Sequence, residues 1–110
     1  MLINNAGILI DDYDGVLNLD LSVLRATMET NLYAKLRSSQ ALFPFLKISD
    51  CARIVNLSSA LGLLRGMGSG DVAYSVSKTA LNALTIKLNA EFRAYGRANC
   101  RYGSLACNGI

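Results

Sequence analysis

The hydrophobic positions of the chain form two short continuous runs and two long stretches with helical spacing. The short runs are Met1-Leu2-Ile3 and the β-branched segment from Arg53 to Ser59, and both are typical of buried strands. The long stretches predict one helix over residues 20–46 and a second that starts just before Tyr74. The order strand, helix, strand, helix predicts an α/β fold with a parallel sheet, in which ligands bind beyond the carboxyl ends of the strands.

The first predicted helix has a polar start and a hydrophobic face. Asp20 or Ser22 can cap the free amide groups at its beginning. Arg25 and Glu29 have the spacing of an ion pair on the outer side. We expect the hydrophobic face to pack into the core; its residues are Leu21, Leu24, Met28 and Leu32.

Two residues interrupt the helical character of this stretch. Asn31 is a middling helix former, so it is either an exposed surface residue or the site of a kink. Pro44, the only proline of the chain, is expected to bend or loosen the last turns.

The second predicted helix follows a glycine-rich segment, which we expect to be a mobile loop and which contains Gly62, Gly66, Gly68 and Gly70. Gly96 is a plausible C-cap of the helix. The inner face repeats at helical spacing through Leu81, Leu84, Leu88, Phe92 and Tyr95. Residues 8–19 show no sustained period and predict a further loop.

Tyr74 and Lys78 lie four residues apart at the start of the second predicted helix. One helical turn places the phenol and the ammonium on the same face, where a positive charge favours the phenolate and allows proton chemistry. The same spacing is also common where a packed ring lies beside a solvated charge. Gly7, after the first strand, allows either a close backbone approach to a ligand or an ordinary turn.

Composition narrows the class of protein. The 110 residues fit one small domain, and a hydrophobic content of 52% is enough to form a core. The net charge of +3 is scattered, so we expect neither nucleic acid nor anionic lipid as a partner. Three cysteines without metal-ligand spacing, and no histidine, predict reduced thiols and no metal site. No run is long enough for a membrane span, and no signal-type segment is evident, so we expect a soluble cytoplasmic protein.

Four motifs occur in an order that resembles the short-chain dehydrogenase/reductase family. They are Asn4-Asn5-Ala6-Gly7, Thr30-Asn31-Leu32, the segment Ile54–Gly62 with Ser59, and the Tyr74/Lys78 pair. From Leu2 to about Ala94 the chain is similar to the second half of that family's nucleotide-binding domain. The resemblance implies an incomplete doubly wound, Rossmann-like parallel sheet flanked by long helices.

The resemblance also implies roles for individual residues. Ser59, Tyr74, Lys78 and Asn31 match the catalytic residues, and Asn5, Ala6, Gly7, Tyr74 and Lys78 match residues that contact the cofactor, NADP or NAD. Hydride would pass between nicotinamide and an alcohol or carbonyl substrate while Tyr74 transfers the proton. Ser59 would hold the substrate oxygen, Lys78 the nicotinamide ribose, and Asn31 a water of the proton relay. The two long helices commonly form the subunit interface in this family.

The sequence departs from the family pattern at both ends. The glycine-rich loop that binds the pyrophosphate belongs upstream of residue 1, and a later Pro-Gly motif is not found, because the sole proline is Pro44. We therefore expect a partial domain over residues 1–96, an atypical tail over residues 97–110 without strand or helix periodicity, and an exposed apolar edge at the first strand. Two functions remain open: part of an NAD(P)(H)-dependent oxidoreductase, inactive alone, or a catalytically inactive remnant that docks on a full-length relative.

Overall fold

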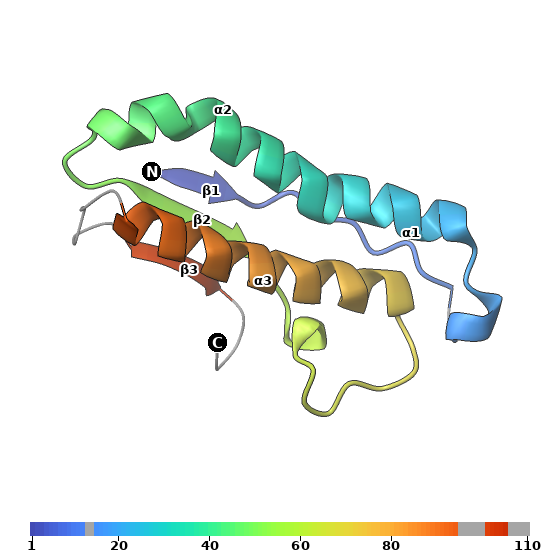
Figure 1. Cartoon of the computed structure of the whole chain (residues 1–110). Coiled ribbons are helices and arrows are strands. Elements are labelled where there is room, and N and C mark those ends of the chain that lie inside the picture. Colours follow the sequence, from blue (N-terminus) through green and yellow to red (C-terminus); the bar gives the residue numbers. More distant parts are fainter. Residues whose placement is uncertain (13–14, 95–100, 106–110) are drawn as a thin grey trace.

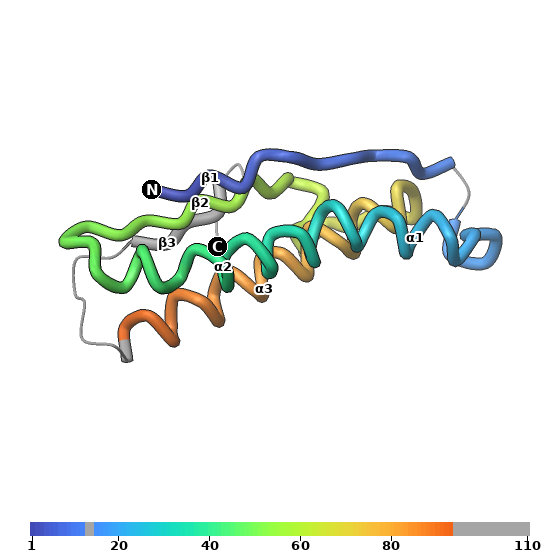
Figure 2. Tube along the Cα trace, turned by 90° about the horizontal axis from the view of Figure 1, so that it is seen from above, coloured from blue at the N-terminus to red at the C-terminus, as the bar shows by residue number. Residues whose placement is uncertain are grey.

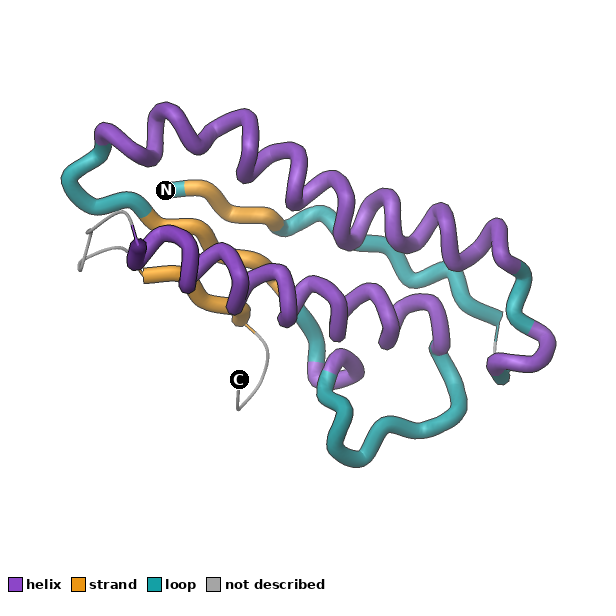
Figure 3. Tube along the Cα trace, viewed as in Figure 1, coloured by secondary structure: helices purple, strands orange, loops and turns teal. Residues whose placement is uncertain are grey.

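The computed structural model describes residues 1–12, 15–94 and 101–105. Figure 3 shows the division into helices, strands and loops along this part of the chain. The elements are β1 (Leu2–Asn4), η1 (Val16–Asn18), α1 (Leu21–Met28), η2 (Glu29–Tyr33), α2 (Ala34–Ile48), β2 (Arg53–Leu57), η3 (Ala60–Gly62), α3 (Val72–Ala94) and β3 (Arg101–Leu105). Of the region predicted as a loop over residues 8–19, only η1 is helical among the described residues.

The three strands form one parallel sheet in the order β1-β2-β3 (Figure 1). Both long helices, α2 and α3, lie on the same side of this sheet when the molecule is seen from above (Figure 2). Parallel neighbours require a crossover, and α1, η2 and α2 supply the one between β1 and β2. The predicted incomplete α/β fold with a Rossmann-like parallel sheet is confirmed.

The C-terminal segment corrects one expectation. Residues 97–110 were expected to lack strand structure, but Arg101–Leu105 forms β3 and pairs with the whole of β2, from Arg53↔Arg101 to Leu57↔Leu105. Backbone pairing with an existing strand, rather than side-chain alternation, specifies this strand. Residues 95–100 and 106–110, including the predicted cap Gly96 and the inner-face residue Tyr95, lie outside the described residues.

A chain of buried and part-buried hydrogen bonds fixes the carboxyl ends of β1 and β2. Asn4 and Asn56 are register partners, and Asn4 Nδ2 donates to Asn56 Oδ1 at 2.7 Å. The chain continues to both helices, because Ser38 Oγ donates to Asn4 Oδ1 at 2.8 Å and Asn56 Nδ2 donates to Thr85 Oγ1 at 2.9 Å. A satisfied polar network of this kind specifies one register, since a slip would leave buried amides unpaired. Among the described strands β1 lies at the end of the order, which agrees with the expected edge, and Ile3, on the face of β1 away from Asn4, is 52% exposed.

The helical run over residues 21–48 starts as predicted, with Asp20 Oδ1 accepting from Ser22 N at 2.8 Å. It passes through Pro44 and ends at Ile48. The expected ion pair of Arg25 with Glu29 is wrong, because Glu29 pairs with Arg37 instead. The wide π turn of η2 begins at Glu29 and precedes Arg37. It therefore changes the angle between these two side chains from the one that a regular α-helix would give.

The buried face of this run is polar, contrary to the sequence prediction. Leu21 is 55% exposed, and Leu24, Met28 and Leu32 are only half-buried. From Leu21 to Ser39 the buried residues are Thr27, Asn31, Lys35 and Ser39, which repeat every four residues, and Leu46 near the end of the run is also buried. Asn31 and Lys35 face the segment after β1, whose backbone groups need hydrogen-bond partners.

The hydrophobic core lies at the opposite end of the helices from the start of α3. It is formed by Leu46, Ala52, Ile54 and Phe92, with Leu2, Phe43 and Leu88 packed against it. Phe43 and Phe92 meet edge to face, with ring centroids 5.2 Å apart. Leu81 and Phe92 of the predicted inner face of α3 are buried, and Leu84 and Leu88 are half-buried.

Candidate active site

Tyr74 and Lys78 lie on the first turns of α3, and the structure brings them together. Lys78 Nζ is 5.5 Å from the centroid of the Tyr74 ring. The Lys78 side chain is only 4% exposed, and Nζ donates to Leu57 O, at the end of β2, at 2.9 Å. Burial lowers the pKa of the Lys78 ammonium, and the charge of Lys35 lowers it further. The pair is therefore a buried ammonium beside a half-buried phenol.

Gly7 lies against this ammonium. A side-chain carbon at position 7 would be 3.6 Å from Lys78 Nζ and 3.5 Å from Asn31 Oδ1. Both distances are ordinary van der Waals contacts, so the loop after β1 lies directly against this ammonium and forms a wall beside Lys78. Asn5 and Ala6, which precede Gly7 in that loop, are exposed.

Asn31 is fully buried inside the π turn η2, so the expectation of an exposed surface residue is wrong. Its amide forms two hydrogen bonds with the backbone of Ile8: Ile8 N donates to Oδ1 at 2.8 Å, and Nδ2 donates to Ile8 O at 2.9 Å. Nδ2 also donates to Ser77 Oγ at 3.0 Å, and that hydroxyl donates to Tyr74 O at 2.7 Å. Asn31 thus connects the loop after β1 to the turn of α3 that carries Tyr74.

Ser59 follows β2 and caps the short helix η3, with its Oγ accepting from Leu61 N at 3.2 Å. The hydroxyl proton is not used in that bond and is available for a ligand oxygen. Two neighbours hold Ser59 near α3: Ser58 Oγ donates to Lys78 O at 3.5 Å, and Gly62 packs directly on the backbone of Lys78.

Gly62 is buried and closely packed in η3, so it is not part of the expected mobile loop. A side-chain carbon there would be 2.9 Å from both the carbonyl carbon and the Cβ of Lys78. We expect Gly62→Ala to lower the free energy of unfolding by about 1–3 kcal/mol, because helix backbone cannot move aside cheaply. Urea unfolding followed by circular dichroism measures this.

Gly68→Ala is the matched control, because nothing lies within 4 Å of the added carbon. The control is expected to be neutral or slightly stabilising, by less than about 1 kcal/mol. Equal stabilities of the two variants would contradict the close packing of η3 on α3.

Asp11 is a structural residue of the site that the sequence did not reveal. Its carboxylate accepts from Ala73 N at 2.6 Å and from Tyr74 N at 3.0 Å. The residue before the helix, Asp71, has a left-handed backbone with φ of 49°, and α3 has no acidic residue in its own first turn. Asp11, 62 residues away in sequence from Ala73, supplies the missing cap. No local signal could identify it, because the capping partner comes from another part of the chain.

Asp11→Ala is expected to lower the free energy of unfolding by about 1–2 kcal/mol, the usual effect of losing an N-cap carboxylate. Amide hydrogen exchange should accelerate at Ala73 and Tyr74 before it does at the centre of α3. Asp12→Ala, at the exposed neighbouring residue, is the control. Protection of the two amides that is unchanged in Asp11→Ala would contradict the cap.

Comparison with known proteins identifies the fold family. The family model described as short chain dehydrogenase matches residues 1–105. The chain belongs to the short-chain dehydrogenase/reductase family. A probable short-chain type dehydrogenase/reductase of Bradyrhizobium diazoefficiens is 35% identical over 111 residues, covering 96% of this chain and 37% of the relative. A short chain dehydrogenase of Emericella nidulans is 36% identical over 93 residues, covering 84% of this chain and 34% of the relative.

Solved structures agree with this membership of the short-chain dehydrogenase/reductase family. A member from Brucella ovis, in complex with a partially ordered NAD, has a TM-score of 0.80 and 29% identity and covers 99% of this chain and 48% of that chain. An NADPH-bound carbonyl reductase from chicken fatty liver has a TM-score of 0.77 and 30% identity, with coverage of 96% and 43%. The chain spans about a third of the length of the curated relatives it matches.

Gly7 and Lys78 fit the nicotinamide end of the cofactor that short-chain dehydrogenases/reductases bind. Gly7 places backbone without a side chain directly beside Lys78. Lys78 Nζ has donors to spare beyond its bond to Leu57 O, and these suit ribose hydroxyls.

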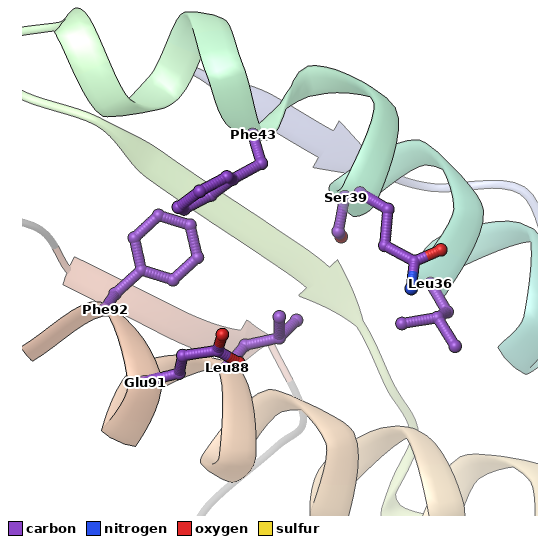
Figure 4. Close-up of a pocket in the computed structure, with 7 residues that line it drawn as sticks. Leu36, Ser39, Phe43, Leu88, Glu91 and Phe92 are labelled. Atoms are coloured by element: carbon purple, nitrogen blue, oxygen red, sulfur yellow. The ribbon is translucent and has the colours of Figure 1, made fainter. Parts of the chain in front are cut away.

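Two hollows in the described part of the chain do not include Tyr74 or Lys78 in their lining, and only the first lies beside the site. One, of about 210 Å³, lies beside the loop after Ser59 and is lined in part by Leu61, Arg65 and Ser75. The other, of about 250 Å³, lies between α2 and α3 and is shown in Figure 4, where Phe43 and Phe92 face each other across the helices.

Two kinds of feature are absent from the part of the short-chain dehydrogenase/reductase chain that the structure describes. No group of three or more His, Cys, Asp or Glu residues is placed there to hold a metal ion. None of the described helices combines the length and the hydropathy that a bilayer crossing needs.

Proposed function

We propose that the chain carries the proton-transfer site of an NAD(P)(H)-dependent oxidoreductase that interconverts alcohols and carbonyl compounds. The observation that carries the proposal is the Tyr74 phenol beside the buried Lys78 ammonium, with the backbone of Gly7 lying against that ammonium. Family membership supports it, as do relatives of similar fold whose structures hold NAD or NADPH.

The residues divide the chemistry among them. The nicotinamide cofactor, when bound, supplies or accepts the hydride. The Tyr74 hydroxyl donates the proton to the substrate oxygen in reduction and accepts it in oxidation, so that no charge is left on that oxygen. Lys78 stabilises negative charge that develops on the phenol oxygen and offers its spare donors to the nicotinamide ribose. Ser59 donates its free hydroxyl proton to the substrate oxygen, a contact whose loss costs on the order of 10²-fold in rate.

Asn31 holds this arrangement together through Ile8 and Ser77. We also assign to Asn31 the relay water that the family resemblance implies. In this assignment Asn5, Ala6 and Gly7 line the nicotinamide, which is NADP or NAD.

A second candidate function is that of an interaction fragment, and exposed hydrophobic residues on both long helices favour it. Phe45 and Ile48 on α2 are 67% and 77% exposed, and Val76 and Ile86 on α3 are also exposed. Such residues suit a subunit interface formed by the two long helices, either between two copies of this chain or with a full-length relative.

Fluorescence titration of the purified 110-residue chain with NADH and NADPH distinguishes the two functions. Saturable binding that is lost in Lys78→Met supports the oxidoreductase site and contradicts the inactive fragment. No binding, together with co-purification of a full-length relative, supports the fragment. Lys87→Met is the matched control, because Lys87 is an exposed lysine of the same helix.

A further inference from the structure

Lys35 is a buried ammonium that the proposed chemistry does not use. It lies on α2, one turn after Asn31, and its side chain is 3% exposed. In the described residues Arg37 and Glu29 form an ion pair. No carboxylate of these residues pairs with Lys35. Burial lowers the pKa of this ammonium. A buried charge without compensation is costly, so the groups that Lys35 contacts must compensate its charge.

Those groups are two backbone carbonyls from different elements. Lys35 Nζ donates to Ala6 O and, at 3.0 Å, to Thr30 O. The Ala6 carbonyl belongs to the peptide that joins Ala6 to Gly7, and the Thr30 carbonyl belongs to the peptide that joins Thr30 to Asn31. The π turn makes room for the second contact, since Ala34 N donates to Glu29 O, five residues back, in place of the usual bond to Thr30 O.

The loop after β1 is therefore held on both sides of Gly7. Lys35 holds the peptide before Gly7, and the Asn31 amide holds Ile8, the residue after it, through both backbone groups. Between these two attachments, the open side of Gly7 faces Lys78 Nζ.

We infer that Lys35 is a positioning residue of this site: with Asn31 it clamps the peptide units that flank Gly7 and so fixes the wall opposite Lys78. The inference rests on the proposed function in one respect only, namely that the ligand bound at this wall is the nicotinamide. The clamp also brings a second positive charge close to Lys78, and this charge contributes to the lowered pKa of Lys78. Tyr74, whose ring centroid is 5.5 Å from Lys78 Nζ, is a further titratable group at this ammonium among the described residues.

Lys35→Met, Lys35→Arg and the control Lys87→Met test the clamp in the 110-residue chain by NMR, without cofactor. In Lys35→Met the length of the side chain is kept and the charge and donors are lost. We expect amide exchange at Ile8 to accelerate about tenfold or more relative to the amides of α3, as loss of a hydrogen bond to a charged group implies. We also expect the titration midpoint of the Lys78 Cε resonance to rise, with the Tyr74 titration followed in the same spectra.

Lys35→Arg retains the charge, so the Lys78 midpoint should stay close to that of the unmodified chain. Amide exchange at Ile8 that is equal in Lys35→Met and Lys87→Met would overturn the inference, because it would show that Lys35 does not hold the loop. If Lys35→Met does not fold, the unmodified chain decides. The Gly7 amide nitrogen is bonded to the Ala6 carbonyl carbon, so its chemical shift should change with pH as Lys35 titrates. A Gly7 nitrogen shift that does not change over this titration overturns the clamp. Failure of NADH binding would count against the proposed function and leave these results unaffected.

Discussion

Replacing Tyr74 with phenylalanine is expected to lower turnover by about 10²- to 10⁴-fold, the usual contribution of a general acid or base. The substitution removes only the hydroxyl and leaves the ring beside Lys78, so cofactor affinity should change little. Steady-state oxidation of NADH or NADPH with a panel of carbonyl compounds measures the first effect. The assay uses a longer, catalytically active form of the protein. Fluorescence titration with the same cofactor measures the second.

Tyr33→Phe is the matched control, because Tyr33 is an exposed tyrosine at the end of the π turn. It loses the same hydroxyl outside the site and should keep full turnover. If Tyr74→Phe retained activity at the level of Tyr33→Phe, Tyr74 would not be the proton-transfer group.

Replacing Asn31 with alanine is expected to lower the free energy of unfolding by about 3 kcal/mol or more, at about 1 kcal/mol for each hydrogen bond and more where a buried partner is left unpaired. The variant loses three hydrogen bonds of a fully buried side chain and leaves both backbone groups of Ile8 without this partner. For a small domain this is a large share of the total stability. Urea unfolding measures it, and the loop after β1 should lose amide protection first.

Asn89→Ala serves as the control for the asparagine substitution, since Asn89 is a half-buried residue of α3. It should change the free energy of unfolding by less than about 0.5 kcal/mol, as for most substitutions away from buried networks. Similar losses in the two variants would show that Asn31 does not connect the loop to α3.

The order of elements and the motif residues could be predicted because both are local in sequence. Hydrophobic runs marked β1 and β2, and the four-residue spacing of Tyr74 and Lys78 placed them on one turn of α3. The roles assigned to Ser59, Tyr74, Lys78 and Asn31 remain predictions from the family resemblance. What the structure adds is that the Asn31 side chain is committed to Ile8 and Ser77.

The parts that could not be predicted depend on contacts between distant segments. Hydrophobic periodicity favours burial of Leu24 and Met28. The face that is buried instead carries Asn31 and Lys35, because the groups that approach it are backbone amides and carbonyls, which need polar partners. Asp11 caps a helix that begins 61 residues later, and β3 takes its conformation from pairing with β2. None of these partners is visible from local pattern or spacing.

The central claim is that Gly7, Tyr74 and Lys78 form one nicotinamide site. Reduced nicotinamide mononucleotide tests it directly, because this ligand presents the nicotinamide and its ribose without the adenylate half of the cofactor. In an NMR titration of the 110-residue chain, the account predicts that the largest saturable shifts fall on the amides of Gly7 and Tyr74 and on the Lys78 Cε group. Shifts confined to the groove between α2 and α3, or equal shifts in Lys78→Met, would contradict it.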